Sequence, residues 1–242
     1  SNIGKAQRHM VFKYLKPILN QGKVLSILEL NCGTGADAIH FGNLGHQVTA
    51  TDISEGMIRK AKAKVYPKNV SFNTQDINSL DTQSFDKKFD LIFSNFGGFN
   101  CLSIKQLESF FNKTKDLLDT NGKLVIVIMP KQCLWEWLYF TLKGDFSKAK
   151  RRQTSEAIIA NVDGVNVKTW YYNPEEIVSL AETLYTKKRI RPIGIAIPPS
   201  YLENSFLAKP PCLSILKRID TMLKGAFWAK YADHFLIELI KK

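Results

Sequence analysis

A glycine-rich turn follows the first apolar stretch of the chain, where residues 27–36 read ILELNCGTGA. Gly33 and Gly35 suit a turn in which a ligand approaches the backbone closely and the chain visits positive φ. Asn31 stands where glycine is usual, and asparagine tolerates the left-handed region better than most residues do. A strand that enters such a turn and then a helix is shared by dinucleotide-binding Rossmann proteins, so the pattern predicts a nucleotide-type cofactor without choosing one.

A carboxylate closes the next predicted strand. Asp52 lies 19 residues beyond Gly33, directly after the strand expected at 47–51. A carboxylate at the end of a strand can accept two hydrogen bonds from the hydroxyls of a ribose. The alternative is that Asp52 only places a negative charge near the dipole of the helix that follows Ser54. The spacing and the strand-end position favour the ribose interpretation.

Three further features separate an S-adenosylmethionine site from an NAD site, the two cofactor classes that the pattern fits. Glu29 ends the first strand, where an acid suits a cationic amino group and is awkward beside a pyrophosphate. Asp76 and Ile77 follow the third strand, where an acid could accept from an adenine amino group. Asn95 and Phe96 belong to a polar, glycine-marked loop after the fourth strand. Ligands of such sheets bind outside the carboxyl ends of the strands, so we expect these groups to meet in one crevice.

Strand and helix patterns alternate along the chain. In the first half we expect strands at 24–30, 47–51, 70–74, 89–93 and 123–129, and helices at 36–44, 55–65 and 104–118, the last opened by a Ser103/Gln106 capping box. In the second half we expect a helix at 132–142, a strand at 165–172, a helix opened by Asn173-Pro174, a strand at 186–197, a helix around 213–223 and a strand at 231–240. This alternation predicts an α/β fold with right-handed βαβ units and a buried parallel sheet.

Together these motifs resemble those of the class I S-adenosylmethionine-dependent methyltransferases and are most similar to the small-molecule "type 11" group. The resemblance covers about residues 24–130 and rests on residues 29–35, Asp52, Asp76-Ile77 and residues 89–95. It implies a Rossmann-like, doubly wound, seven-stranded sheet of order 3-2-1-4-5-7-6, with the last strand antiparallel and an insertion after strand 5. It also implies S-adenosyl-L-methionine as the cofactor and S-adenosyl-L-homocysteine as the product.

The resemblance implies a contact for each motif. The glycine turn receives the methionine part of the cofactor, Asp52 holds the ribose, Asp76 meets the adenine amino group, and the loop after the fourth strand lies beneath the reacting methyl. The implied cofactor-binding residues are Glu29, Asn31, Cys32, Gly33, Gly35, Asp52, Ile53, Met57, Asp76, Ile77, Asn95 and Phe96. Asn31 departs from the family pattern at a place where glycine is usual.

We expect one methyltransferase domain over residues 1–242. Its predicted parts are an N-terminal helix in 1–22, the cofactor-binding core in 24–130, a helical and basic insertion in 131–172, and a C-terminal completion of the sheet in 173–242. The four cysteines lie far apart, without CxxC spacing or a nearby histidine pair, which predicts reduced thiols, no metal site and a cytoplasmic protein. No secretory segment follows the start, which agrees with that expectation.

The insertion holds the features expected to choose the methyl acceptor. Residues 133–140 read CLWEWLYF, and a helix that is apolar nearly all round is usually buried. The alternative is a lid over an apolar or lipid-like acceptor, with the basic segment Lys143–Arg152 on its acidic head or on a membrane surface. Tyr14, Trp135 and Tyr171 are the candidate substrate contacts. No residue stands out as a catalytic base, which a hydroxyl acceptor would need and a carboxylate would not.

The net charge of +12 is concentrated in residues 123–242, which carry +8. Such a surplus, densest at Lys143–Arg152, can meet an acidic substrate, a nucleic-acid backbone or an anionic lipid surface, or it can form the solvated face of a basic protein. A nucleic-acid or membrane partner is not the favoured interpretation. We predict a methyltransferase that transfers its methyl group in-line to a small-molecule acceptor, apolar or acidic. The alternatives are a nucleic-acid methyltransferase, a non-catalytic cofactor-binding scaffold and an NAD oxidoreductase. The sequence indicates no oligomeric state.

Overall fold

The computed structural model describes residues 1–80, 82–162 and 164–242. These residues form two compact units. Unit 1 comprises Ser1–Gln21, Val127–Ile177 and Arg189–Ile237, and unit 2 comprises Gly22–Ile126, Val178–Lys188 and Glu238–Lys242. The division of one domain into segments 1–22, 24–130, 131–172 and 173–242 stays a prediction.

The helices and strands have the following bounds. The helices are α1 Asn2–Leu19, α2 Ala36–Asn43, α3 Glu55–Lys62, α4 Ile104–Leu117, α5 Leu134–Leu142, α6 Phe146–Ala149, α7 Pro174–Ala181 and α8 Pro210–Met222. The strands are β1 Ser26–Leu30, β2 Gln47–Asp52, β3 Val70–Thr74, β4 Phe89–Ser94, β5 Leu118–Ile128, β6 Ile158–Val162, β7 Val165–Thr169, β8 Tyr185–Ile193 and β9 His234–Lys241.

Across the described residues, no helix combines the length and the apolar character that crossing a bilayer requires.

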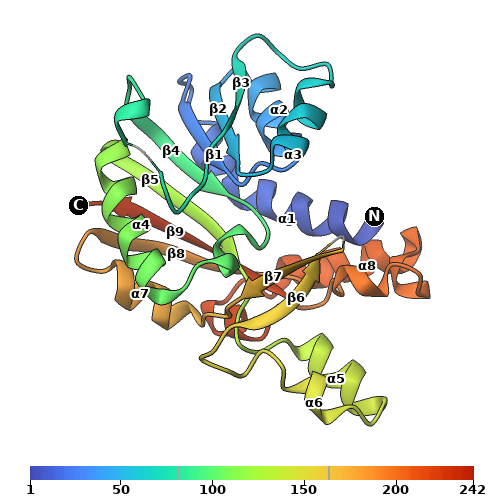
Figure 1. Ribbon diagram of the computed structural model, residues 1–242. Helices are drawn as coiled ribbons and strands as arrows, with labels where there is room; N and C mark the ends of the chain where they lie inside the picture. The colour runs from blue at the N-terminus through green and yellow to red at the C-terminus, as the bar shows by residue number, and fades with distance from the viewer. Residues whose placement is uncertain (81, 163) are drawn as a thin grey trace. The chain divides into compact units, whose positions relative to one another are not determined.

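Seven strands of the described chain form one sheet in the order β3-β2-β1-β4-β5-β9-β8 (Figure 1). Strands β1 to β5 pair in parallel, and the last strand of the chain, β9, is antiparallel. The order is the predicted 3-2-1-4-5-7-6, because β6 and β7 form a separate two-stranded sheet and shift the later numbers by two. The predicted fold class is therefore confirmed.

The register of the parallel strands brings the predicted polar residues to one edge of unit 2. Leu30 of β1 lies opposite Thr51 of β2 on one side and Ser94 of β4 on the other. The glycine turn, Asp52 and Asn95 therefore leave the sheet at the carboxyl ends of three adjacent strands. This is the edge at which open α/β sheets bind their ligands.

Helices cover both faces of the unit 2 strands. Figure 1 shows α2 and α3 on one side of β1–β4 and α4 on the other. On the α2 side, the rings of Phe41 and Phe93 meet edge to face with centroids 5.3 Å apart. On the α4 side, Phe99 and Phe110 pack in the same manner at 4.6 Å. The first pair joins α2 to β4, and the second joins α4 to the 3-10 turn Gly98–Cys101 that follows β4. Such pairs add to the free energy of area burial.

The three predicted helix starts of unit 2, at residues 36, 55 and 104, are confirmed, while some element ends differ. The Ser54 side chain caps α3 by accepting the backbone N–H of Met57, and a Ser103/Gln106 capping box opens α4. Helix α3 ends at Lys62, three residues earlier than predicted. Helix α4 passes directly into β5 at Leu118, so the expected stop at residues 121–122 lies within the strand.

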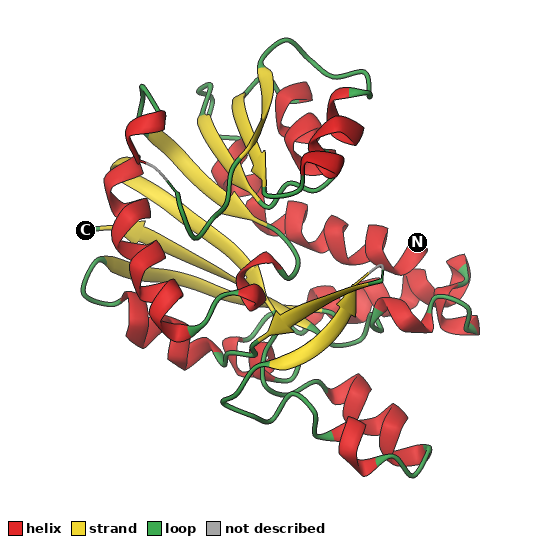
Figure 2. Cartoon of the chain, viewed as in Figure 1, coloured by secondary structure: helices red, strands yellow, loops and turns green. Residues whose placement is uncertain are grey.

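Unit 1 contains a hairpin that the sequence analysis missed. The strand predicted at 165–172 ends at Thr169, and its antiparallel partner is β6, with Ile159 opposite Lys168 (Figure 2). The strand predicted at 186–197 ends at Ile193, because Gly194 adopts a φ of 79°. Elsewhere in unit 1, α1 contacts α8, and α5 contacts α6.

The predicted burial of the helix at 132–142 is wrong. Every residue of α5 is described, and Glu136 is the one that is buried. Trp137, Leu138 and Leu142 are 48%, 44% and 79% exposed. The physical reason is that the acid of this helix faces inward to meet Arg152, which turns the apolar side outward.

Candidate functional site

The turn after β1 has three residues in the left-handed region. The φ angles of Asn31, Gly33 and Gly35 are 55°, 54° and 74°. A Cβ at Gly35 would lie 2.5 Å from the ring of Phe72, whereas a Cβ at Gly33 would meet nothing within 4 Å. Gly35 therefore lets the turn pack against the sheet, and Gly33 leaves the backbone open to a ligand.

Three buried carboxylates surround the thiol of Cys32. Glu29, Asp37 and Asp52 are 2%, 3% and 9% exposed. Burial, and then the charges of these acids, raise the pKa of Cys32 far above its usual range, so the thiol stays protonated and is no nucleophile. So much negative charge in one place favours a cation, such as an ammonium or sulfonium group, and opposes a pyrophosphate.

Backbone amides hold the Asp52 carboxylate at both oxygens. The N–H of Gly33 donates to Oδ2 at 2.8 Å, and the N–H of Ser54 donates to Oδ1 at 2.9 Å. These bonds fix the carboxylate between the glycine turn and the start of α3. A carboxylate offers about four lone-pair sites, so Asp52 retains capacity for the hydroxyls of a ligand.

The loop after β3 places Asp76 beside this group of residues. Asp52 lies opposite Thr74 in the register, and the N–H of Gln75 donates to the carbonyl oxygen of Asp52 at 3.0 Å. The Oδ1 atom of Asp76 accepts the N–H of Asn78 at 2.8 Å, and Ile77 is buried. Asp76 is thus an oriented acid on the loop next to the ribose candidate.

The chain turns sharply where β4 ends. Phe96 has a φ of 39° and Gly97 a φ of 83°. A positive φ at a bulky residue costs on the order of 1–3 kcal/mol, and such strain clusters at functional sites. Asn95 is buried just before the turn, and its Nδ2 donates to Oδ2 of Asp37 at 2.8 Å.

Asn31 joins the first loop to the fourth. Its Nδ2 donates to Oγ of Ser94 at 3.4 Å. A Cβ at Gly98 would lie 2.1 Å from the same nitrogen. The asparagine that replaces the usual glycine therefore fills the space between the two loops, and it needs a glycine opposite.

Asp37 is the residue of this site that the sequence analysis missed. It lies in the first turn of α2, two residues after Gly35. The signal was present, because an acid there follows the glycine turn directly. The attraction between an acid and the helix dipole is a sufficient explanation for such a residue, so the sequence gives no reason to seek another. Its burial and its bond to Asn95 place it in the acidic group.

Not every predicted contact joins this group. Ile53 follows Asp52 but is 62% exposed, and Met57 is half-buried in α3. The three candidate substrate contacts, Tyr14, Trp135 and Tyr171, belong to unit 1. Their roles, like those of the cofactor residues, stay predictions.

The unit 1 candidates are held by their own unit. Burial raises the pKa of Tyr14 to about 12, so its hydroxyl is a poor base at neutral pH. The indole N–H of Trp135 donates to the carbonyl of Ile195 at 2.9 Å. The ring of Tyr171 lies 5.3 Å from the guanidinium carbon of Arg152.

A buried ion network organises unit 1. Arg152 is 5% exposed, and its Nη2 donates to Glu136 at 2.7 Å and to Asp233 at 2.9 Å. Arg151 adds two bonds to Glu136. Burial raises the pKa of Glu136 and of Asp233, but their neighbours lower both pKa values below the usual range. For Glu136 these neighbours are Arg152 and Arg151, and for Asp233 they are His234 and Arg152. The network ties α5 and the basic segment to the start of β9.

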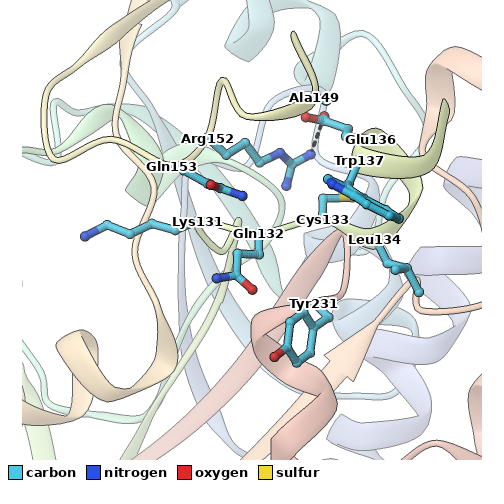
Figure 3. Close-up of a pocket in the computed structure, with 10 residues that line it drawn as sticks. All are labelled: Lys131, Gln132, Cys133, Leu134, Glu136, Trp137, Ala149, Arg152, Gln153 and Tyr231. Carbon is cyan, nitrogen blue, oxygen red and sulfur yellow. Dashed lines mark hydrogen bonds and ion pairs between the residues drawn. The ribbon is translucent and has the colours of Figure 1, made fainter. Parts of the chain in front are cut away.

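A pocket of about 250 Å³ lies in unit 1 at the N-terminal end of α5 (Figure 3). Leu134 and Trp137 form its apolar side, and Lys131, Gln132 and Gln153 its polar side. Figure 3 shows Arg152 extending toward Glu136, so this guanidinium serves the ion network. In the part of the chain that is described, no group of three or more His, Cys, Asp or Glu residues is placed to hold a metal ion.

Comparison with known proteins identifies the family. A family model described as a methyltransferase domain matches residues 27–122. The malonyl-[acyl-carrier protein] O-methyltransferase of Bacillus cytotoxicus is 33% identical over 264 aligned positions, covering 100% of this chain and 86% of that protein. The chain belongs to the class I S-adenosylmethionine-dependent methyltransferases.

Further relatives of this methyltransferase agree at lower coverage or identity. The protein of the same name from Bacillus cereus is 33% identical over 97 residues, which span 39% of this chain and 35% of that protein. A crystal structure of magnesium protoporphyrin IX methyltransferase from Synechocystis with bound SAH has a TM-score of 0.62 at 14% identity, covering 100% of this chain and 86% of that one. An S-adenosylmethionine-dependent methyltransferase from Mesorhizobium loti has a TM-score of 0.61 at 13% identity, with coverage of 95% and 96%. These two structures support the fold.

The cofactor of this methyltransferase is S-adenosylmethionine, as predicted. The residues of unit 2 fit it. The acidic group of Glu29, Asp37 and Asp52 matches a ligand with a cationic amino group and a sulfonium, and the open side of Gly33 leaves room against the backbone.

Proposed function

We propose that this methyltransferase acts on the free carboxylate of a short dicarboxylic acyl group of the malonyl class, carried as a thioester on an acyl carrier protein. The observation that supports the proposal is the 33% identity to the Bacillus cytotoxicus enzyme, whose alignment runs through 100% of this chain. That alignment includes residues 131–242 as well as the cofactor core. The likeness therefore extends to the segments expected to choose the acceptor.

In this proposal unit 2 binds the cofactor. Glu29 holds the cationic amino group, Asp52 accepts the ribose hydroxyls, and Asp76 accepts from the adenine amino group. The backbone at Gly33 lies against the methionine part. When bound, the cofactor supplies a methyl group on a sulfonium sulfur that is already activated for in-line displacement. The protein's task is alignment and exclusion of water.

A carboxylate acceptor suits the groups that the chain offers. The nucleophilic oxygen of a carboxylate carries no proton at neutral pH, so the transfer requires no general base. Tyr14 agrees with this chemistry, because a phenol with a pKa of about 12 can donate a hydrogen bond but does not take a proton. The positive charge of residues 123–242 favours an acidic acceptor.

The test is a transfer assay with matched acceptors. The protein and S-adenosylmethionine are incubated with malonyl-loaded and acetyl-loaded acyl carrier protein, and mass spectrometry detects the methyl ester. We expect methylation of the malonyl thioester alone, since the acetyl thioester has no free carboxylate. An Asp52→Ala variant serves as the background control. Equal methylation of both thioesters, or of neither, would refute the proposed acceptor.

A further inference from the structure

Helix α5 carries an exposed apolar stripe. Leu134, Trp137, Leu138 and Leu142 are spaced at i, i+3, i+4 and i+8, which places them on one face of the helix. Their exposed fractions are 44%, 48%, 44% and 79%, and Phe146 at the start of α6 is 63% exposed. We refer to these five residues as the α5–α6 stripe.

The other side of α5 anchors the helix to unit 1. Glu136 is held by the ion network, and the indole N–H of Trp135 donates to Ile195. The rings of Tyr139 and Phe140 lie 5.5 Å and 6.1 Å from that of Tyr201. Since these contacts fix the rotation of the helix, the stripe is held outward by the folded unit.

Basic side chains border the stripe. Of the six basic residues in 131–153, three lysines are exposed: Lys143, Lys148 and Lys150. The others are compensated, because Lys131 pairs with Glu176 and both arginines belong to the ion network around Glu136. The ammonium of Lys143 lies 4.5 Å from the ring centroid of Tyr139, and that of Lys148 lies 6.0 Å from the ring centroid of Phe140. Both ammonium groups belong to exposed side chains and lie near aromatic rings of the helix that carries the stripe. Exposed cations close to apolar surface suit a boundary between water and an apolar phase.

The apolar character and the positive charge of this surface favour one of three candidate partners: nucleic acid, a second copy of the chain or a bilayer. Bare nucleic acid offers bases for stacking, but three of the five residues are leucines, which do not stack. A second copy of the chain would bring two surfaces of the same charge together. A bilayer interface with anionic headgroups satisfies both the apolar stripe and the positive rim, and it accepts a helix that lies in its plane. With nine residues, α5 is about 14 Å long, which is too short to cross the hydrocarbon core of a bilayer.

We propose that the α5–α6 stripe and its basic rim bind anionic phospholipid bilayers, with α5 lying in the interface plane. This property is independent of the proposed acceptor.

The experiment uses the full chain and two kinds of vesicle, phosphatidylcholine alone and phosphatidylcholine mixed with phosphatidylglycerol. We expect co-sedimentation with the mixed vesicles and weak or no binding to the neutral ones. Raising NaCl from about 0.1 M to about 1 M weakens binding, because salt screens the charges. A double Lys143→Gln, Lys148→Gln variant loses about fivefold in partition for each lysine. The matched control is Lys60→Gln, Lys62→Gln on α3.

A second set of variants tests how much the apolar side chains of the stripe contribute to vesicle binding. Trp137→Ser with Leu142→Ser removes two members of the stripe, and we expect at least a tenfold loss of binding. Phe206→Ser with Met222→Ser is the control, since both residues are exposed apolar residues of unit 1 outside the stripe. The tryptophan emission of the wild type shifts to shorter wavelength with mixed vesicles, and Trp137→Phe reduces that shift. Circular dichroism confirms that each variant is folded.

Three results would overturn the inference. One is the absence of binding to mixed vesicles, and another is equal binding by the stripe variants and their controls. The third is capture of an acidic acyl carrier protein by this surface without any binding to vesicles, which would assign the stripe to a protein partner.

Discussion

Each unit has a cluster of buried carboxylates, and the two clusters differ in what their oxygens contact. In unit 1, Glu136 and Asp233 contact the guanidinium of Arg152. In unit 2, Asp52 accepts from two backbone amides and Asp37 from a side-chain amide. Amides orient a carboxylate and leave its charge, whereas a guanidinium neutralises it. The unit 2 cluster is therefore suited to a cationic ligand, and the unit 1 cluster to holding segments together.

The largest effect is expected when the unit 1 cluster is broken. Glu136→Ala leaves the buried guanidinium of Arg152 undercompensated, and we expect a loss of about 3–5 kcal/mol in the free energy of unfolding. Urea denaturation measures it. Lys148→Ala removes one partner of the exposed pair with Asp145 and leaves the backbone amide that caps α6, so it serves as the control, with little change in the midpoint. If the two variants behaved alike, the network would have no structural role.

We expect a substitution in the unit 2 cluster to weaken cofactor binding. Asp52→Ala is expected to weaken binding of S-adenosylhomocysteine by about 2–3 kcal/mol, because hydrogen bonds to a charged group are lost. Isothermal titration calorimetry gives the affinity. Glu55→Gln removes a nearby exposed acid and should leave the affinity close to that of the wild type. Equal affinities for both variants would contradict a ligand role for Asp52.

Two glycines of the same turn sharpen the distinction between packing and binding. Gly35→Ala pushes a methyl group against Phe72 at a positive φ, and we expect a loss of about 1–3 kcal/mol in stability. Gly33→Ala places its methyl group in open space, so we expect a smaller loss of stability and a larger loss of cofactor affinity. Thermal unfolding with and without S-adenosylhomocysteine separates the two effects. The reverse pattern would exchange the roles assigned to the two glycines.

The smallest predicted effect is a dependence on acid pH. The folded-state pKa values of Glu136 and Asp233 lie below the usual 4.5 and 3.8. A depressed carboxylate stabilises the fold fully above its unfolded pKa, and this contribution is lost as the pH falls through the folded value. Between pH 6 and pH 3 the stability of the wild type should therefore decline more steeply than that of Glu136→Gln. Parallel curves would contradict this.

The sequence predicted the fold of the parallel strands well because its signals are local. A strand, a glycine turn and a helix lie within residues 26–43, and parallel register then carries Asp52 and Asn95 to the same edge. The Ser103/Gln106 capping box is likewise read within four residues. Asp37 was missed as a site residue because its hydrogen bond to Asn95 spans 58 positions, and no local sequence pattern reveals such a contact.

The insertion was predicted less well because its structure depends on distant partners. Arg152 holds Glu136 of α5 and is itself held by Asp233 across 81 positions, so the side of α5 that faces inward depends on a distant partner. An apolar composition indicates that the side chains of a helix are buried against another surface. It does not indicate whether that surface belongs to the same chain. Strand β6 was missed because a short, exposed strand is recognised mainly through its partner.

The contact between Asn31 and Gly98 links the evolutionary fates of two positions that are 67 residues apart in the chain. While asparagine occupies the first, a side chain at the second would collide with it, so Gly98→Ala should be tolerated only after Asn31 has been replaced by glycine. In directed evolution of this enzyme, the substitution at position 31 would have to come before the substitution at position 98. Libraries that vary the two loops separately would discard combinations that work only together.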